Sequence, residues 1–126
     1  MKKTKWDVKK VEQELRDFAL EYPESHEDFP WGERAIKVKA KAFLFMRADE
    51  EAGLVSLSCK LPQSRDLAAE LPFAEPTHYG LGKHGWVTAK LTAKEADAVE
   101  LMKAWIDESF RAVAPKKLVA TLPPRG

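Results

Sequence analysis

The sequence contains a single cysteine and no long apolar run. Cys59 has no second thiol to pair with, which excludes an internal disulfide and a cysteine-rich metal site. A lone cysteine fits a reducing compartment, so we expect a cytoplasmic protein. No stretch approaches the roughly eighteen apolar residues that a membrane span needs. Met1-Lys2-Lys3 is followed by polar residues instead of the apolar core of a signal peptide. We therefore expect no membrane contact.

The chain also lacks a strong charge of either sign. Its 21 basic and 20 acidic residues leave a formal net charge of +1, so any attraction to nucleic acid must come from a local patch. A hydrophobic content of 44% and a charged content of 33% are typical of a globular protein. The length of 126 residues favours one domain over residues 1–126, with flexible ends at 1–6 and 120–126. We expect a monomer.

Catalytic signatures are missing as well. We find no paired carboxylates, nucleophile elbow or metal-ligand spacing, so we expect no enzymatic activity, no cofactor and no metal. The sequence Gly-Leu-Gly-Lys-His-Gly at 80–85 is not a phosphate-binding loop, because Ser or Thr does not follow the lysine and a strand follows instead of a helix. His78, Tyr79 and His84 have the chemistry for acid–base work, but structural or exposed histidines explain them more simply.

Residues 24–32 are rich in acids and are bracketed by prolines and a glycine, which predicts an ordered loop. We expect Phe29 and Trp31 to be tucked beneath it. The adjacent residues His26-Glu27-Asp28 resemble a metal cluster by composition. Three adjacent side chains cannot all point at one ion from a strand or a helix, so an acidic loop is the better interpretation.

Apolar residues recur at helical spacing in two long segments. Residues 7–22 are predicted to form an amphipathic helix with an aspartate as its N-cap and a proline after its end. Thr92 and Glu95 form a capping box at the start of a second long helix, which a proline ends at 115. A shorter helix is expected within 62–71.

The strands are predicted from alternating apolar and polar residues. Residues 34–47 form a hairpin with a turn near 39–42, which we expect to be loose because it lacks Asn-Gly or Gly-Gly. Residues 54–60 form a third strand, in which Cys59 faces inward as a buried structural thiol. His78-Tyr79 lie on a short fourth strand, and 86–91 form a fifth.

The predicted order is α-β-β-β-α-β-β-α. Consecutive strands with short links imply an antiparallel five-stranded sheet. We expect the two long helices to cover this sheet, which gives a two-layer α+β sandwich. The outward positions of these strands, together with the glycine-broken turn before residue 86, are rich in lysine and contain one tryptophan. The candidate nucleic-acid-binding residues are Lys37, Lys39, Lys41, Lys60, Lys83, His84, Trp86 and Lys90. A lysine-rich strand face that only protects a sheet edge from pairing is the alternative.

The chain resembles the MmcQ/YjbR family of small bacterial proteins. The resemblance covers about residues 8–119 and rests mainly on the segments 27–32, 36–45, 55–60 and 78–87. It implies a two-layer fold similar to secretion chaperones, and the family is described as a "double wing" DNA-binding domain. Two departures are the turn Lys39-Ala40-Lys41, where the family usually reads Gly-Gly-Lys, and Gly85, where a bulkier residue is common.

Two function classes follow from these observations. Outward lysines and hydroxyls around Trp86 would neutralise phosphates and stack a base, which predicts nucleic-acid binding. The alternative is a protein- or peptide-binding module that resembles a secretion chaperone, with an exposed Trp86 as an interface anchor. Salt separates the two, because phosphate contacts weaken steeply as salt rises and apolar contacts need not.

Overall fold

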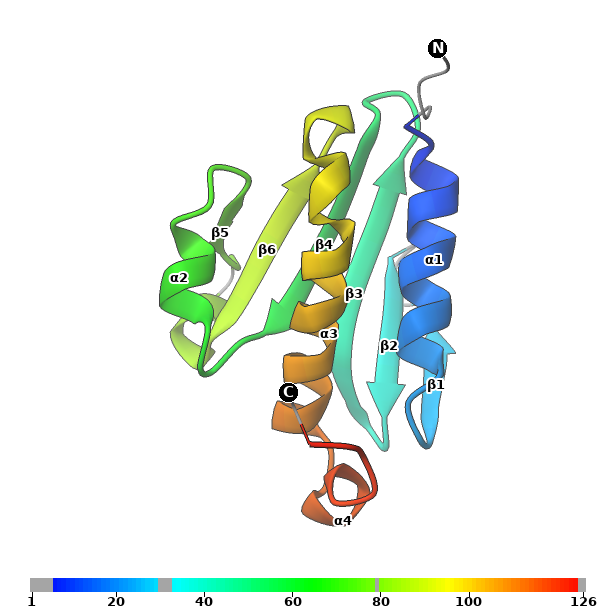
Figure 1. The fold of residues 1–126 in the computed structure, drawn as a ribbon, viewed down its shortest axis with the longest axis vertical. Helices are drawn as coiled ribbons and strands as arrows, with labels where there is room; N and C mark the ends of the chain where they lie inside the picture. The colour runs from blue at the N-terminus through cyan, green and yellow to red at the C-terminus, as the bar shows by residue number, and fades with distance from the viewer. Residues whose placement is uncertain (1–5, 30–32, 79, 125–126) are drawn as a thin grey trace.

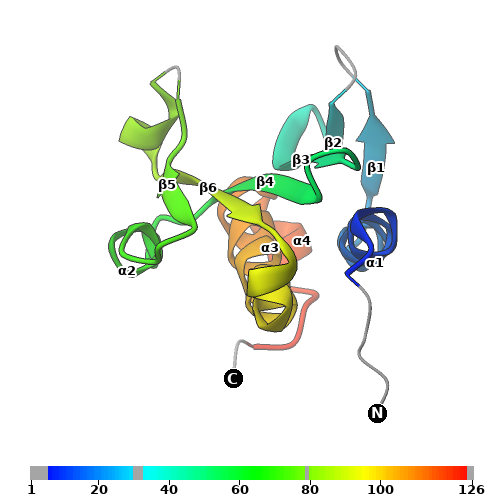
Figure 2. The same ribbon diagram turned by 90° about the horizontal axis from the view of Figure 1, so that it is seen from above.

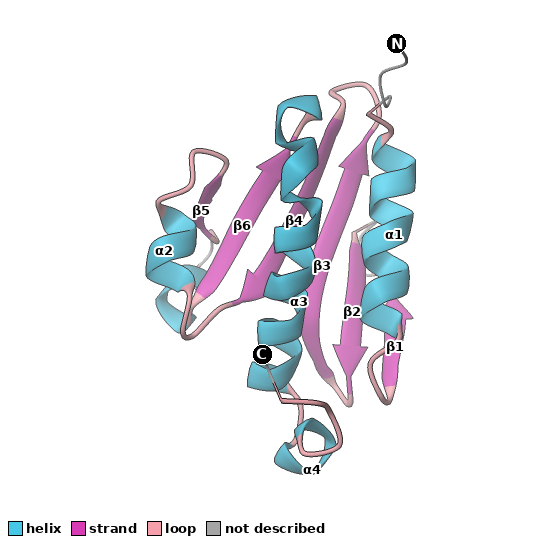
Figure 3. Ribbon diagram, in the orientation of Figure 1, coloured by secondary structure: helices cyan, strands magenta, loops and turns pink. Residues whose placement is uncertain are grey.

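The fold is an open antiparallel sheet with helices on one side, in a computed structural model that describes residues 6–29, 33–78 and 80–124. The sheet has six strands in the order β1-β2-β3-β4-β6-β5 (Figures 1 and 3). The strands are β1 Ser25–Asp28, β2 Arg34–Val38, β3 Lys41–Asp49, β4 Leu54–Lys60, β5 Ala74–Pro76 and β6 Trp86–Leu91. The helices are α1 Val8–Leu20, α2 Arg65–Ala69, α3 Val99–Val113 and α4 Lys116–Val119, with 3-10 turns η2 Leu81–His84 and η3 Ala93–Ala98.

The helix ends follow from local sequence. Asp7 accepts hydrogen bonds from the backbone N–H groups of Lys9 and Lys10, which confirms the predicted N-cap of α1. The capping box of Thr92 and Glu95 is also present. It opens the 3-10 turn η3, however, and Glu95 itself has non-helical backbone angles. The regular helix α3 therefore begins only at Val99.

The main core lies between the sheet and the helices α1 and α3. These helices lie on the same side of the sheet when it is viewed along its edge (Figure 2). Ile106 on α3 and Leu57 and Cys59 on β4 are buried in this core, so the predicted inward positions are confirmed. Burial raises the pKa of the Cys59 thiol, and the nearby Glu108 carboxylate raises it further. The buried thiol is therefore held in its neutral, unreactive form.

A buried hydroxyl on α3 enters the sheet where its ladder is interrupted. The pairing of β3 with β4 runs as far as Phe45 opposite Ser58. Beyond that point, Ser109 Oγ donates to the Phe43 carbonyl over 2.6 Å and accepts from the Lys60 N–H over 2.8 Å. One hydroxyl thus satisfies two backbone groups, the buried Phe43 carbonyl and the partly buried Lys60 N–H.

The sixth strand corrects the sequence prediction. Residues Ser25–Asp28, expected in an acidic loop, pair with β2 as the edge strand β1. Glu27 binds Arg16 of α1 over 2.9 Å and also Arg34 of β2, so its carboxylate joins the edge strand to its neighbours. Phe29 is 55% exposed and is not tucked away. Trp31 lies outside the described residues.

The hairpin turn and the fourth strand also differ from expectation. Val38 pairs with Lys41, so only Lys39 and Ala40 form the turn, which is tight instead of loose. Lys39 adopts a left-handed backbone with φ of 57°, and a register shift between Ile36 and Lys37 provides the extra twist. The strand expected at His78-Tyr79 lies earlier in the chain, as β5 Ala74–Pro76, and His78 is in a turn. Tyr79 lies outside the described residues.

The chain ends are anchored where they are described. Trp6 Nε1 donates to the Gly53 carbonyl over 2.9 Å. Near the other end, Arg111 donates to the Pro123 carbonyl over 2.6 Å. The flexibility expected for the ends at 1–6 and 120–126 stays a prediction. Residues 1–5 and 125–126 lie outside the described part.

Replacing Ser109 tests the bridge between α3 and the sheet. Ser109→Ala keeps the shape of the side chain but leaves the Phe43 carbonyl and the Lys60 N–H buried without a partner. We expect the free energy of unfolding to fall by about 1–3 kcal/mol, measured by chemical denaturation. Ser56→Ala, on the opposite face of the sheet, is the control and is expected to cost less than about 0.5 kcal/mol. Equal losses in the two variants would show that the bridge does not stabilise the fold.

Candidate functional site

Among the described residues, no α-helix packs on one face of the sheet. Figure 2 shows α1, α3 and α4 below the sheet, while β1 and η2 rise at its two edges on the other side. The pairing register fixes which residues lie on this uncovered face, because side chains alternate along each strand. They form rows across the strands. One row has Arg47, Ser56 and Lys90, the next has Phe45, Ser58 and Thr88, and a third position pairs Lys60 with Trp86.

The middle row is a chain of hydroxyl groups beside an aromatic ring. Thr88 Oγ1 lies 2.7 Å from Ser58 Oγ and 2.9 Å from Thr77 Oγ1. These distances are those of hydrogen bonds between hydroxyls. Thr77 also donates its N–H to the Trp86 carbonyl over 3.0 Å, which attaches the segment before η2 to β6. The middle of the face is therefore rigid and polar, with Phe45 half-buried at one end.

Trp86 faces this side, as the strand alternation predicts, but it is not exposed. Only 8% of the residue is accessible, and its ring lies against Phe45 with centroids 5.5 Å apart. Trp86 is also outside the main core cluster. The two rings thus form a small apolar cluster of their own on the uncovered face. The expectation of an exposed Trp86 is wrong, and Phe45 is the ring of the pair that is more accessible.

Acidic neighbours neutralise part of the predicted basic surface. Lys37 Nζ lies 3.1 Å from Asp28, Lys90 Nζ lies 3.5 Å from Glu75, and Lys39 at the hairpin turn lies 2.7 Å from Glu24. The Asp28 carboxylate accepts hydrogen bonds from the Lys37 ammonium and from the Phe29 N–H. Both hold the pKa of the Asp28 carboxyl below its ordinary value. Such exposed pairs are weak, so a phosphate can replace the carboxylate as partner of each lysine.

Two cations on the uncovered face, Arg47 and Lys60, form no ion pair with any described residue. Arg47 is exposed in the centre of the sheet, opposite Ser56. It was not among the predicted site residues, although it alternates with Phe45 in the same strand and so shares its face. The structure therefore brings Lys37, Lys60, Trp86 and Lys90 together and adds Phe45 and Arg47.

The remaining predicted residues lie at the margins of this face. Lys41 is exposed at the start of β3, beside the hairpin turn. Lys83 and His84 are exposed in η2. Left-handed glycines, Gly80 and Gly85, flank this turn, which explains why a glycine-broken segment precedes β6.

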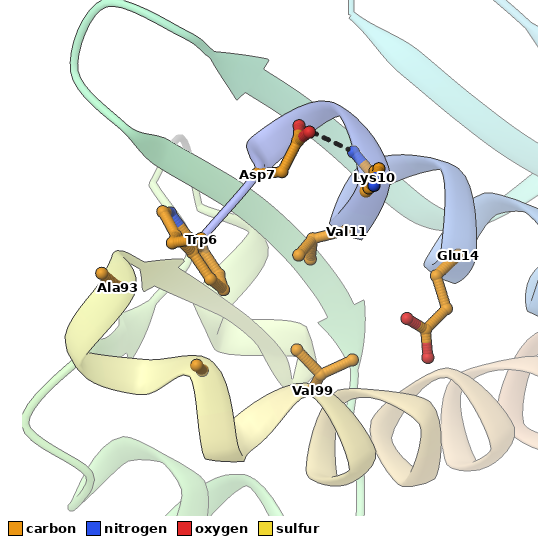
Figure 4. A pocket seen from close by; sticks show the side chains of 8 residues that line it. Trp6, Asp7, Lys10, Val11, Glu14, Ala93 and Val99 are labelled. Atoms are coloured by element: carbon orange, nitrogen blue, oxygen red, sulfur yellow. Dashed lines mark hydrogen bonds between the residues drawn. The ribbon is translucent and has the colours of Figure 1, made fainter. Parts of the chain in front are cut away.

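Two hollows of the described surface lie on the helix side of the sheet. A cavity of about 320 Å³ opens where α1 faces η3 and α3, with Trp6, Val11 and Val99 directed into it (Figure 4). Two of its polar groups already have partners, since Asp7 caps α1 and Glu14 binds Lys103 over 2.8 Å. A larger cavity, of about 560 Å³, lies between α2 and α3.

No group of three or more His, Cys, Asp or Glu side chains among the described residues is placed to hold a metal ion. In the expected acidic cluster, Glu27 and Asp28 bind cations of the protein itself. None of the described helices combines the length and the apolar character needed to span a bilayer.

Comparison with known proteins supports the resemblance seen in the sequence. The family model described as YjbR matches residues 20–112, which include all six strands. The fold is similar to the crystal structure of a Pseudomonas syringae protein, with a TM-score of 0.58 over 80% of this chain and 97% of that chain. The two sequences are 18% identical, so this likeness concerns the fold alone. The comparison with curated proteins found no significant match.

Proposed function

The chain belongs to the YjbR family, and we propose that the uncovered face of its sheet binds single-stranded nucleic acid. The observation that carries this proposal is the position of Arg47 and Lys60. They lie on opposite sides of the row formed by Phe45, Ser58 and Thr88, and no described acid pairs with either. A cationic group on each side of a polar and aromatic row suits a phosphate backbone that crosses the strands.

The distribution of charge supports this surface despite a net charge of only +1. The long helices on the far side have no excess of cations, since α1 carries three acids and three bases and α3 carries three acids and two bases. The acids beside the lysines of the uncovered face, Asp28 and Glu75, are in exposed or half-exposed pairs. A polyanion that approaches the uncovered face therefore meets a local excess of cations.

The aromatic and hydroxyl groups favour a single strand over a duplex. A base can stack on Phe45 only when it is free of its own helical stack, whereas bases in a duplex are covered on both faces. Ser58 is the more accessible hydroxyl of the row and can bond phosphate or sugar oxygens, which positions a strand without reading its sequence. We therefore expect weak sequence preference.

The salt dependence of binding tests the cationic groups. For the double variant Arg47→Ala with Lys60→Ala, we expect the slope of log affinity against log salt to flatten by about 1.4, since each phosphate contact to a single strand contributes about 0.7. The measurement is a fluorescence titration with a labelled mixed-sequence oligonucleotide at several salt concentrations. Lys9→Ala with Lys116→Ala removes the same charge from α1 and α4 and is expected to keep the wild-type slope. Slopes that are equal in the two double variants, or no binding at about 50 mM salt, would refute the proposal.

Phe45 tests the stacking contact separately. Phe45→Leu retains an apolar group over Trp86, so the fold is expected to persist, but it removes the accessible ring. We expect the affinity for oligothymidylate to weaken by about 1–3 kcal/mol with the salt slope unchanged. Phe18→Leu, a half-buried ring on α1, is the control and is expected to bind like wild type. Unchanged affinity in a folded Phe45→Leu protein would exclude stacking on this ring.

A further inference from the structure

The cavity between α2 and α3 lies on the helix side of the protein and is a second candidate binding site, separate from the uncovered sheet face. Figure 1 places α2 and α3 on the same side of the sheet, with β6 and β4 visible between them. The cavity of about 560 Å³ is lined mainly by apolar groups, including Leu67 and Leu71 from the α2 side and Leu101 and Trp105 from α3. We refer to it as the α2–α3 groove.

The leucines of this groove are unusually accessible. Leu67 is 75% exposed and Leu101 is 40% exposed. Single exposed apolar residues are common on protein surfaces and need no explanation. Here, however, two of them come from different helices and line one hollow, with the buried Trp105 also lining it. Apolar surface that converges in this way is typical of a binding site for another apolar surface.

The groove is held in shape before any partner arrives. The Glu108 carboxylate on α3 accepts hydrogen bonds from the N–H groups of Gln63 and Ser64, at 2.8 Å and 3.1 Å, and from the Ser64 hydroxyl at 2.6 Å. These bonds fix the start of α2 against α3. Because α2 has only five residues, it has little stability of its own, and the Glu108 contacts set its position. A partner would thus meet walls that are already in place, which lowers the entropic cost of binding.

Charge indicates the chemistry of the partner. The charged residues that line the groove are Glu70 and Glu108, and its described lining includes no lysine or arginine. Arg65 of α2 lines a different hollow, on the side of η2. The groove therefore repels a polyanion, which separates it from the uncovered sheet face, and it favours a partner with cationic groups beside its apolar ones.

We propose that the α2–α3 groove binds an amphipathic helix of another protein, with leucine-like side chains on one face and lysine or arginine beside them. A helix matches the groove because its i, i+3, i+4 and i+7 side chains form an apolar ridge. Helices pack at interaxial distances of about 8–10 Å, so one helix can contact α3 and α2 together. Leu67 and Leu101 would contact the ridge, and Glu70 would pair with a flanking cation.

A displayed peptide library tests this class of partner directly. The probe is a library of helical peptides in which the residues on one face of the helix are varied. Each peptide has about 16 residues, which is long enough for a stable ridge of several turns. It is selected on the wild-type protein. We expect the recovered peptides to share leucine-like residues at helical spacing and flanking lysine or arginine. Leu67→Glu and Glu70→Lys should each weaken a recovered peptide by about tenfold or more, equivalent to about 1.4 kcal/mol.

The controls keep the outcomes distinct. Leu67 is mostly exposed, so Leu67→Glu is expected to fold normally. Leu81→Glu places the same change at an exposed leucine in η2 and should leave peptide binding intact. Selection of no peptides, or of peptides that bind Leu67→Glu as well as wild type, would overturn the proposal. Self-association of the wild type that Leu67→Glu abolishes would also overturn it, because a second copy would then be the occupant.

The groove and the sheet face are tested independently. Leu67→Glu lies on the helix side and should bind oligothymidylate like the wild type. Arg47→Ala should in turn bind a selected peptide like the wild type. A failure of one proposal therefore leaves the other standing.

Discussion

The fold depends on the buried hydroxyl of Ser109. It enters the sheet just past the end of the β3–β4 ladder, where it bonds both the Phe43 carbonyl and the Lys60 N–H. The neighbouring Glu108 binds the backbone and side chain at the start of α2. Two consecutive polar residues on the inner side of α3 thus fix its position relative to β3, β4 and α2. Polar contacts of this kind define one arrangement, whereas apolar packing alone tolerates several.

This attachment has consequences for both candidate surfaces. With α1 and α3 packed on one side, none of the described α-helices covers the other side of β3, β4 and β6 (Figure 2). The sheet protects that side in part with its own residues, since Phe45 packs on Trp86 and Thr88 bonds Ser58 and Thr77. What stays accessible is a polar surface with Arg47 exposed near its centre. The same attachment of α2 to α3 shapes the groove on the helix side.

The sequence predicted those features that depend on local periodicity or capping. The inward positions of β4, the caps at Asp7 and Thr92 and the antiparallel α+β class were all visible in it. The strand β1 was missed because its residues, Ser-His-Glu-Asp, are polar throughout and become a strand only by pairing with β2. The tight turn was missed because Lys39 adopts a left-handed backbone that lysine disfavours. Trp86 was placed on the correct face, but alternation does not reveal that Phe45, distant in sequence, covers it.

We propose that the uncovered sheet face, and not the helix side, binds nucleic acid. The most direct test is to follow the backbone amide NMR signals of ¹⁵N-labelled protein during titration with an oligothymidylate. We expect the shifted signals to cluster at Phe45, Arg47, Ser58 and Thr88, together with Lys60, while those of Leu101 and Glu108 stay in place. Shifts confined to α1 and α3, or no shifts at any oligothymidylate concentration, would contradict this proposal.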